Sequence, residues 1–358
     1  MANNMRVFWA VQGVVIGEMG EATINTSSPF NDKTKLNPVH GLQSVGITTT
    51  FNLEQVFEMG QLSLYENLEE VPDVEVTLEK VIDGYPLIYH LATSNPTIAA
   101  GTDTLIGRSN ERCDLRLAVY GDALSKAGAV NPQSEVYCSG MYVSSISYTI
   151  PVDGNMTESV TLVGNHKKWY TGTDGEIDNA DLGFGSDVPL SGIARRQHIN
   201  MTASNFPPEI PGVGSDGQMD SQKGDIQNDP LAHIQSISVS ADLGREQINE
   251  LGHKGPYTRY VSWPVEVTTE FEVITASGDH VDALPNTDNL SNRAIYIAVS
   301  GASYPAGKNF VLDLGDKNKL TSVSYSGADT GGGYATTSFS YSTFNDLTIW
   351  SAHNPTNG

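Results

Sequence analysis

The sequence predicts a mainly β protein: two tandem homologous domains, each an antiparallel β-sandwich or incomplete barrel with at most a short helix. First, a segment that begins at residue 42 recurs at residue 234, an offset of 192 positions. Second, apolar and polar residues alternate with a period of two in both copies, which is the pattern of half-buried strands. Third, 35 glycines and only 17% charged residues suit a chain with many turns.

The repeat aligns without a gap when LQSVGITTTFNLEQVFEMGQ (42–61) is set against IQSISVSADLGREQINELGH (234–253). A period this long that occurs only twice indicates two related domains rather than a solenoid. After one skipped residue, VEVTLE (74–79) aligns with VEVTTE (265–270). The identical pairs in the first block are Gln43/Gln235, Ser44/Ser236, Glu54/Glu246, Gln55/Gln247, Glu58/Glu250 and Gly60/Gly252.

Each copy predicts a strand, a protruding loop and a second strand. Val45 and Ile47 alternate with small polar residues in the first strand. The shared E-Q-φ-x-E-φ-G segment, where φ is apolar, is too short for a stable helix and ends in glycine, as a turn does. Pro72 or Pro264 then opens the second strand. We expect one face of that strand to be apolar and the other to be polar and acidic, with Glu75, Thr77, Glu79, Glu266, Thr268 and Glu270.

Later segments follow in the same order in both halves. The sequence divides into an N-terminal arm (1–41), a first β domain (42–170), a connector (171–233) and a second β domain (234–358). Part of the connector, residues 194–201, is a candidate to pair with the N-terminal strand. The matching segments are 115–120 with 294–299, 142–149 with 320–325, and 158–163 with 337–342.

The composition excludes several classes of function. A net charge of −22 argues against a protein that grips nucleic acid through its phosphates. No apolar run reaches the ~18 residues of a membrane span, and the N-terminus has no clear signal peptide. The two cysteines, Cys113 and Cys138, cannot form a disulfide scaffold, although a single bridge stays open.

We find no motif that has the spacing and context of a catalytic, cofactor or metal site. Gly212–Gly217 matches G-x-G-x-x-G without a strand before it, and the spacing in Gly301–Lys308 is too long for a P-loop. Asp174, Asp178 and Asp181 lack the pattern of an EF-hand. The acids of the second strand, such as Glu75 and Glu79, lie about 13 Å apart, beyond the reach of a glycosidase pair. We therefore expect no enzyme activity, no cofactor and no metal.

The strand, loop and strand in EQVFEMGQLSLYENLEEVPDVEVTLEKVIDGYP and EQINELGHKGPYTRYVSWPVEVTTEFEVITASGD resemble the tail-tube domain of tailed bacteriophages. The resemblance covers both repeats but neither the arm nor the connector. It implies rings of six such domains, stacked into a tube whose β-barrel lumen passes DNA and the tape-measure protein. Most tube proteins carry one domain, so the duplication here implies three chains in a ring.

The resemblance also implies a virion tail protein that assembles in the host cytoplasm and contacts itself, the tail sheath or other tail proteins, and passing DNA without specific binding. An acidic lumen would repel phosphates and let DNA slide. A baseplate-hub or tube-initiator protein with the same domains is one alternative. Another is a carbohydrate-binding β-sandwich of a tail fibre, although the tyrosines are spread over both repeats.

The two protruding loops differ in charge, which predicts a role in ordering neighbouring domains. The first loop is acidic and the second has basic residues and no acid between positions 253 and 262. An acidic loop beside a basic loop is favoured over like beside like. The alternative is that both loops are merely solvated. The expected interface residues are Glu54, Gln55, Glu58, Gly60, Glu66, Glu69, Glu70, Glu246, Gln247, Glu250, Gly252, Lys254 and Arg259.

Overall fold

A computed structural model shows a mainly antiparallel β protein of the sandwich type, which confirms the predicted fold class. The described residues contain two short helices, α1 (Ile88–Ala92) and α2 (Leu105–Arg108), both in the first half, and a 3-10 turn at Arg196–His198. The structure describes residues 7, 12–19, 36–93, 104–120, 132–171, 192–200, 207, 209–210, 233–274, 281, 283–285, 290–299, 310–327, 330 and 333–351.

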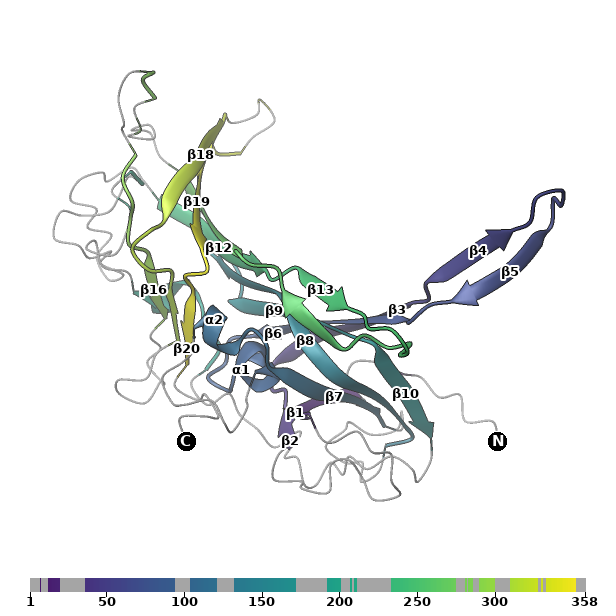
Figure 1. Ribbon diagram of the computed structural model, residues 1–358. Helices are drawn as coiled ribbons and strands as arrows, with labels where there is room; N and C mark the ends of the chain where they lie inside the picture. Colours follow the sequence, from purple (N-terminus) through teal and green to yellow (C-terminus); the bar gives the residue numbers. More distant parts are fainter. Residues whose placement is uncertain are drawn as a thin grey trace.

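The strands fall into two sets, one for each half of the chain (Figure 1). The first set is β1 (Gln12–Glu18), β2 (Leu36–Pro38), β3 (Leu42–Thr50), β4 (Leu53–Phe57), β5 (Leu64–Glu69), β6 (Asp73–Val81), β7 (Arg112–Val119), β8 (Ser134–Pro151), β9 (Thr157–Gly164) and β10 (His166–Thr171). The second set is β11 (Ile199–Asn200), β12 (His233–Asp242), β13 (Arg245–Ile248), β14 (Thr258–Val261), β15 (Glu266–Ile274), β16 (Tyr296–Val299), β17 (Phe310–Asp313), β18 (Lys319–Ser326), β19 (Thr336–Phe344) and β20 (Thr348–Trp350).

Each repeat forms a four-stranded antiparallel sheet with the same strand order. In repeat 1 the order is β3-β6-β9-β8, and in repeat 2 it is β12-β15-β19-β18. The last strand of the first sheet, β8, pairs with the first strand of the second sheet, β12. The two repeats therefore share one continuous sheet of eight strands. The segment after the first strand is a β-hairpin in each repeat, β4–β5 or β13–β14.

The pairing registers superimpose the two repeats residue by residue, irregularities included. Val45 pairs with Leu78 as Ile237 pairs with Phe271. A bulge interrupts these ladders at the identical residues Gln43 and Gln235. A second bulge, between β8 and β9, recurs between β18 and β19, so position 144 corresponds to position 321.

This register corrects one detail of the sequence alignment. The segment VEVTLE (74–79) corresponds to residues 267–272 and not to residues 265–270. Apolar and polar residues alternate in both strands, so a shift of two positions keeps every side chain on its face and preserves most of the similarity. The wrong and the right alignments are therefore hard to tell apart by pattern alone.

A second layer of strands packs behind this sheet. In repeat 1 it contains β2, β1, β7, the first half of the long strand β8, and β10. In repeat 2 it contains β11, β16, β17 and β20. The connector strand β11 pairs with β16, as β1 pairs with β7, so the prediction that it pairs with the N-terminal strand is wrong. It occupies in repeat 2 the place that β1 occupies in repeat 1.

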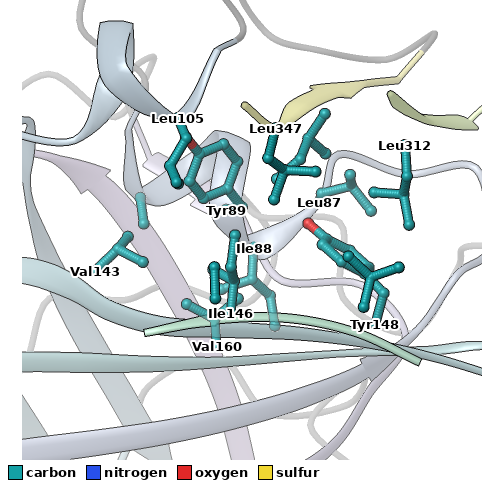
Figure 2. Packing of buried hydrophobic residues seen from close by; sticks show 14 of the residues in the cluster. Leu87, Ile88, Tyr89, Leu105, Val143, Ile146, Tyr148, Val160, Leu312 and Leu347 are labelled. Carbon is teal, nitrogen blue, oxygen red and sulfur yellow. The ribbon is translucent and has the colours of Figure 1, made fainter. Parts of the chain in front are cut away.

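The two short helices connect the repeats. All five residues of α1 are buried, and Figure 2 shows Ile88 and Tyr89 in the cluster with Tyr148, Leu312 and Leu347. Both helices also reach the second layer of repeat 2: His90 Nε2 lies 2.9 Å from the carbonyl oxygen of Ile349, and the Leu105 amide donates to Leu347 at 2.8 Å. One hydrophobic core therefore spans both repeats.

A buried carboxylate holds the first turn of α1 in place. Glu158 on β9 accepts hydrogen bonds from the amides of Ile88 and Tyr89 at 2.7 and 3.1 Å and from the Tyr148 hydroxyl at 3.0 Å. Burial raises the pKa of Glu158, although the nearby Lys80 and these hydrogen bonds oppose that shift. Because the free amides at a helix start need acceptors, this side chain fixes the helix against the sheet.

Candidate assembly surface

One face of the eight-stranded sheet packs on the core, and the other is open and polar. On β6 the buried Val74, Val76 and Leu78 alternate with exposed or half-buried acidic and hydroxyl residues. β15 repeats this with Val267 and Phe271 buried. The six residues predicted for a polar acidic face all lie on this side, and they are Glu75, Thr77, Glu79, Glu266, Thr268 and Glu270.

One cross-strand row of the open face is polar along its whole length. It crosses all eight strands, and each member pairs with the next. Every member before the last carries a hydroxyl or a carboxylate, and the last is a lysine. Neither an aromatic nor an amide side chain interrupts this row. The row is Ser44, Glu79, Ser159, Ser147, Ser240, Thr268, Ser342 and Lys319.

The charges on this face are mainly negative. Strands β6, β12 and β15 present seven carboxylates on it. Ser44 Oγ donates to Glu79 at 3.3 Å, and Ser236 Oγ donates to Glu272 at 3.2 Å, so the same short contact recurs in both repeats. The seven are Asp73, Glu75, Glu79, Asp242, Glu266, Glu270 and Glu272.

The joint between the repeats is a regular antiparallel ladder between β8 and β12. It runs from Ser236 opposite Pro151 to Asp242 opposite Ser145. Past its end, the Leu243 amide donates to the Ser144 carbonyl at 2.8 Å. We call this ladder the internal seam.

The outer edges of the joined sheet are β3 and β18. By position in their repeats, β3 corresponds to β12 and β18 corresponds to β8, the two strands of the internal seam. Within the described residues, β3 pairs with β6 alone and β18 pairs with β19 alone. Their side chains are open where the counterparts are covered. Phe51 is 71% exposed and its counterpart Leu243 is 0% exposed, while Tyr325 is 70% exposed and its counterpart Tyr148 is 0% exposed.

The β13–β14 hairpin folds back over the end of the open face of repeat 1. Arg259, which is buried, forms an ion pair with Asp73 at the start of β6, and its Nε donates to Asn165 at 3.2 Å. Gln247 Nε2 also donates to Asp73, at 2.8 Å. The Tyr142 hydroxyl lies 3.1 Å from Thr258 Oγ1. Arg259 of the basic hairpin therefore pairs with Asp73 on strand β6 of repeat 1 and not with the acidic loop.

The surroundings of Asp73 favour its charged form. Burial alone would raise its pKa, but hydrogen bonds from Asn52, Arg259 and Gln247 and the charge of Arg259 outweigh that effect. The pKa of Asp73 therefore lies below its ordinary value of 3.8. No local sequence pattern indicates this cluster, because its members come from four distant segments.

Among the residues that the structure describes, none holds the β4–β5 hairpin against the sheet in this way, and the hairpin projects away from the body of the protein (Figure 1). Its exposed large apolar side chains are Leu53, Phe57, Met59, Leu62, Leu64, Tyr65 and Leu68, and the exposed Phe51 lies just before it. Contiguous exposed apolar surface of this kind is uncommon on soluble proteins.

The predicted interface residues all lie on the two hairpins. Gly60 and Gly252 sit in the turns with φ values of 96° and 91°, so the prediction that the shared segment ends in a turn is confirmed. Lys254 is exposed in the second turn, and Arg259 is the member that the fold buries. The acidic members and the glutamines, which are Glu54, Gln55, Glu58, Glu66, Glu69, Glu70, Glu246, Gln247 and Glu250, are all exposed.

Several motifs weighed in the sequence lie outside the described residues. These are the glycine-rich segment 212–217, the segment 301–308 and the acidic positions 174, 178 and 181. Cys113 and Cys138 are described, and both are free and fully buried. Burial raises the pKa of both thiols, that of Cys138 to about 12. Within the described part of the chain, no helix has the length and apolar character needed to cross a membrane.

The chain has a weak structural similarity to components of two solved assemblies. One is the tube-terminating cap of the anti-feeding prophage, with a TM-score of 0.32, 11% identity, and coverage of 48% of this chain and 95% of that one. The other comes from the sheath–tube complex of an extracellular contractile injection system in its extended state, with a TM-score of 0.31, 10% identity, and coverage of 47% and 94%. No protein-family model and no curated protein matches the sequence.

Proposed function

We propose that this protein is a structural subunit of a phage tail tube, and that three chains close a ring around an acidic channel. The observation that carries the proposal is the internal seam. It joins the edges of two similar sheets, β8 of repeat 1 and β12 of repeat 2. The equivalent edges, β18 and β3, stay open at the two ends of the joined sheet. Because an open strand edge pairs readily with another, β18 of one chain is suited to pair with β3 of the next, as β8 pairs with β12.

Ring size follows from the strand count and the resemblance to tube domains. Three chains give six four-stranded units, or 24 strands. At a spacing of about 4.8 Å and a tilt of about 40°, 24 strands enclose a backbone circle about 48 Å across. Side chains reduce this width, and the remaining channel still admits a DNA duplex. Closure of the ring also removes every exposed edge of the sheet.

The open face is the surface suited to line the channel. Its hydroxyls make weak contacts, and its carboxylates repel phosphate. DNA would then pass without specific binding. The exposed apolar hairpins and the outer surface of the ring are left for stacked rings, the sheath or other tail proteins. The role needs neither a catalytic group nor a cofactor.

Electron microscopy of the purified protein, combined with mass measurement, tests the proposal. We expect rings or tubes with three chains in each ring. Persistent monomers at high protein concentration, or a ring of six whole chains with the second repeat on its outside, would refute it. The alternative, a carbohydrate-binding protein of a tail fibre, predicts particles without a central channel. It also predicts that the protein binds to immobilised glycans on an array.

A further inference from the structure

Beside the internal seam, the chain makes a hairpin contact, and the sheet of repeat 2 holds the counterparts of the positions that this hairpin covers. In repeat 1, the β13–β14 hairpin covers three positions at one end of the open face: Tyr142, Asn165 and Asp73. The strand registers place their counterparts in repeat 2 at Lys319, Phe344 and Glu266.

These positions are more buried in repeat 1, where a hairpin covers them, than in repeat 2. Tyr142 is 7% exposed and buried beneath the hairpin, and Asp73 and Asn165 are half-buried. Lys319, Glu266 and Phe344 are exposed, Phe344 by 55%. The three repeat 2 positions therefore form a platform without its hairpin.

The β4–β5 hairpin has the matching side chains. The ladders of the two hairpins align Glu66 with Thr258, Asn67 with Arg259 and Gln55 with Gln247. Thr258 lies against Tyr142 inside the chain, so the same docking on the next chain brings Glu66 against Lys319. A neutral hydrogen bond in the internal seam is thus replaced by a pair of opposite charges between chains.

The second contact keeps its chemistry. Gln247 donates to the Asp73 carboxylate inside the chain. Its counterpart Gln55 is also a glutamine, and the counterpart of Asp73 is Glu266, another carboxylate. The amide–carboxylate hydrogen bond can therefore form at both junctions, whereas the ion pair of Arg259 cannot, because Asn67 takes its place.

We propose that the β4–β5 hairpin of one chain docks on repeat 2 of a second copy of this chain, with Glu66 against Lys319 and Gln55 against Glu266. The inference rests on the proposed ring and names the contacts that would close it. Glu66 and Lys319 do not meet within one chain, because β5 and β18 lie at opposite ends of the sheet (Figure 1).

A charge exchange tests the pairing. Glu66→Lys and Lys319→Glu should each raise the protein concentration needed for rings, about 1.5- to 5-fold per junction, as expected for exposed ion pairs. The double variant should recover most of the loss. The defect should be largest near 0.01 M salt, where the screening length is about 30 Å, and should shrink as salt rises. Asp153→Lys, the same charge change in the exposed turn between β8 and β9, is the matched control and should have little effect.

A cysteine pair gives a second measurement that does not depend on ion-pair energy. Glu66→Cys with Lys319→Cys should form disulfide-linked dimers and trimers on oxidation of assembled rings, while Glu58→Cys with Lys319→Cys should not. Both native cysteines are buried and should not interfere.

The two proposals fail in different ways. Wild-type protein that forms no rings contradicts the proposed function. Wild-type rings combined with normal assembly of Glu66→Lys at low salt and no cross-link at Glu66 and Lys319 would overturn the hairpin docking alone. Cross-linking between two Glu66→Cys positions would place the hairpins against each other and would overturn it as well.

Discussion

Substitution of Phe51 by alanine should weaken contacts between chains while leaving the isolated chain as stable as before. Its counterpart Leu243 is fully buried at the end of the internal seam, whereas Phe51 is 71% exposed at the open edge. If the outer edges pair as the inner ones do, Phe51 becomes buried only on assembly. Leu243→Ala is then the matched control, because it removes the equivalent side chain from the seam inside the chain.

The size of the effect follows from area. A fully buried aromatic side chain removes about 150–250 Å² from water, so the exposed 71% of Phe51 leaves roughly 105–180 Å² to bury. At about 25 cal/mol per Å², this area contributes up to about 2.5–4.5 kcal/mol at each junction. Alanine should therefore raise the dissociation constant by up to about 60- to 1600-fold. Leu243→Ala should instead lower the folding stability of the chain by about 2–5 kcal/mol.

Analytical ultracentrifugation across a range of concentrations measures the first effect, and thermal or urea unfolding of the unassembled chain measures the second. The pattern expected is weak assembly with normal unfolding for Phe51→Ala and a clear loss of folding stability for Leu243→Ala. Rings of Phe51→Ala that form at the wild-type concentration would refute the equivalence of the two junctions. So would equal loss of chain stability in both variants.

Asp73→Asn should loosen the β13–β14 hairpin by about 1 kcal/mol at pH 7. Because the folded pKa of Asp73 is lowered, its stabilising effect is present above pH 3.8 and is lost as the pH falls through the folded pKa, so thermal unfolding of variant and wild type should converge at low pH. Cys113 and Cys138 should resist alkylation at pH 7 until the chain unfolds, and fast labelling of the native chain would contradict their burial. Glu75→Gln combined with Glu79→Gln should leave assembly largely intact and abolish no catalytic turnover, and a hydrolase activity lost in that variant would contradict a purely structural role.

The sequence could predict those parts of the fold that depend on local pattern. Alternation identified the strands around Val45 and Val76, and the second copy at a fixed offset identified the same order of strands in repeat 2. The glycines at positions 60 and 252 marked turns, because positive φ is unfavourable for other residues. A single chain with two copies offers an internal comparison that most sequences lack.

Other features could not be predicted, since they depend on contacts between distant segments. No local pattern indicates that β8 continues from one layer into the other, or that it pairs with β12. The contact of Arg259 with Asp73 joins residues 186 positions apart. The charges of the loops predicted that the basic loop contacts an acidic loop. Arg259 instead contacts Asp73 at the start of β6, a residue that the charge pattern did not indicate.

In the proposed ring, the alternation of the two repeats does not depend on the charges of the hairpins. The edges that the internal seam leaves open already impose this order. Each repeat has a leading edge, β3 or β12, and a trailing edge, β8 or β18. The internal seam uses the trailing edge of repeat 1 and the leading edge of repeat 2. Only the leading edge of repeat 1 and the trailing edge of repeat 2 remain, so any ring built from such seams alternates the repeats. In the proposed ring, the charges that differ between the hairpins serve separate junctions: Arg259 contacts Asp73 within the chain, and Glu66 would meet Lys319 of a neighbouring chain. Two junctions with the same backbone geometry can in this way carry different side-chain chemistry, one made once during folding and the other made during assembly.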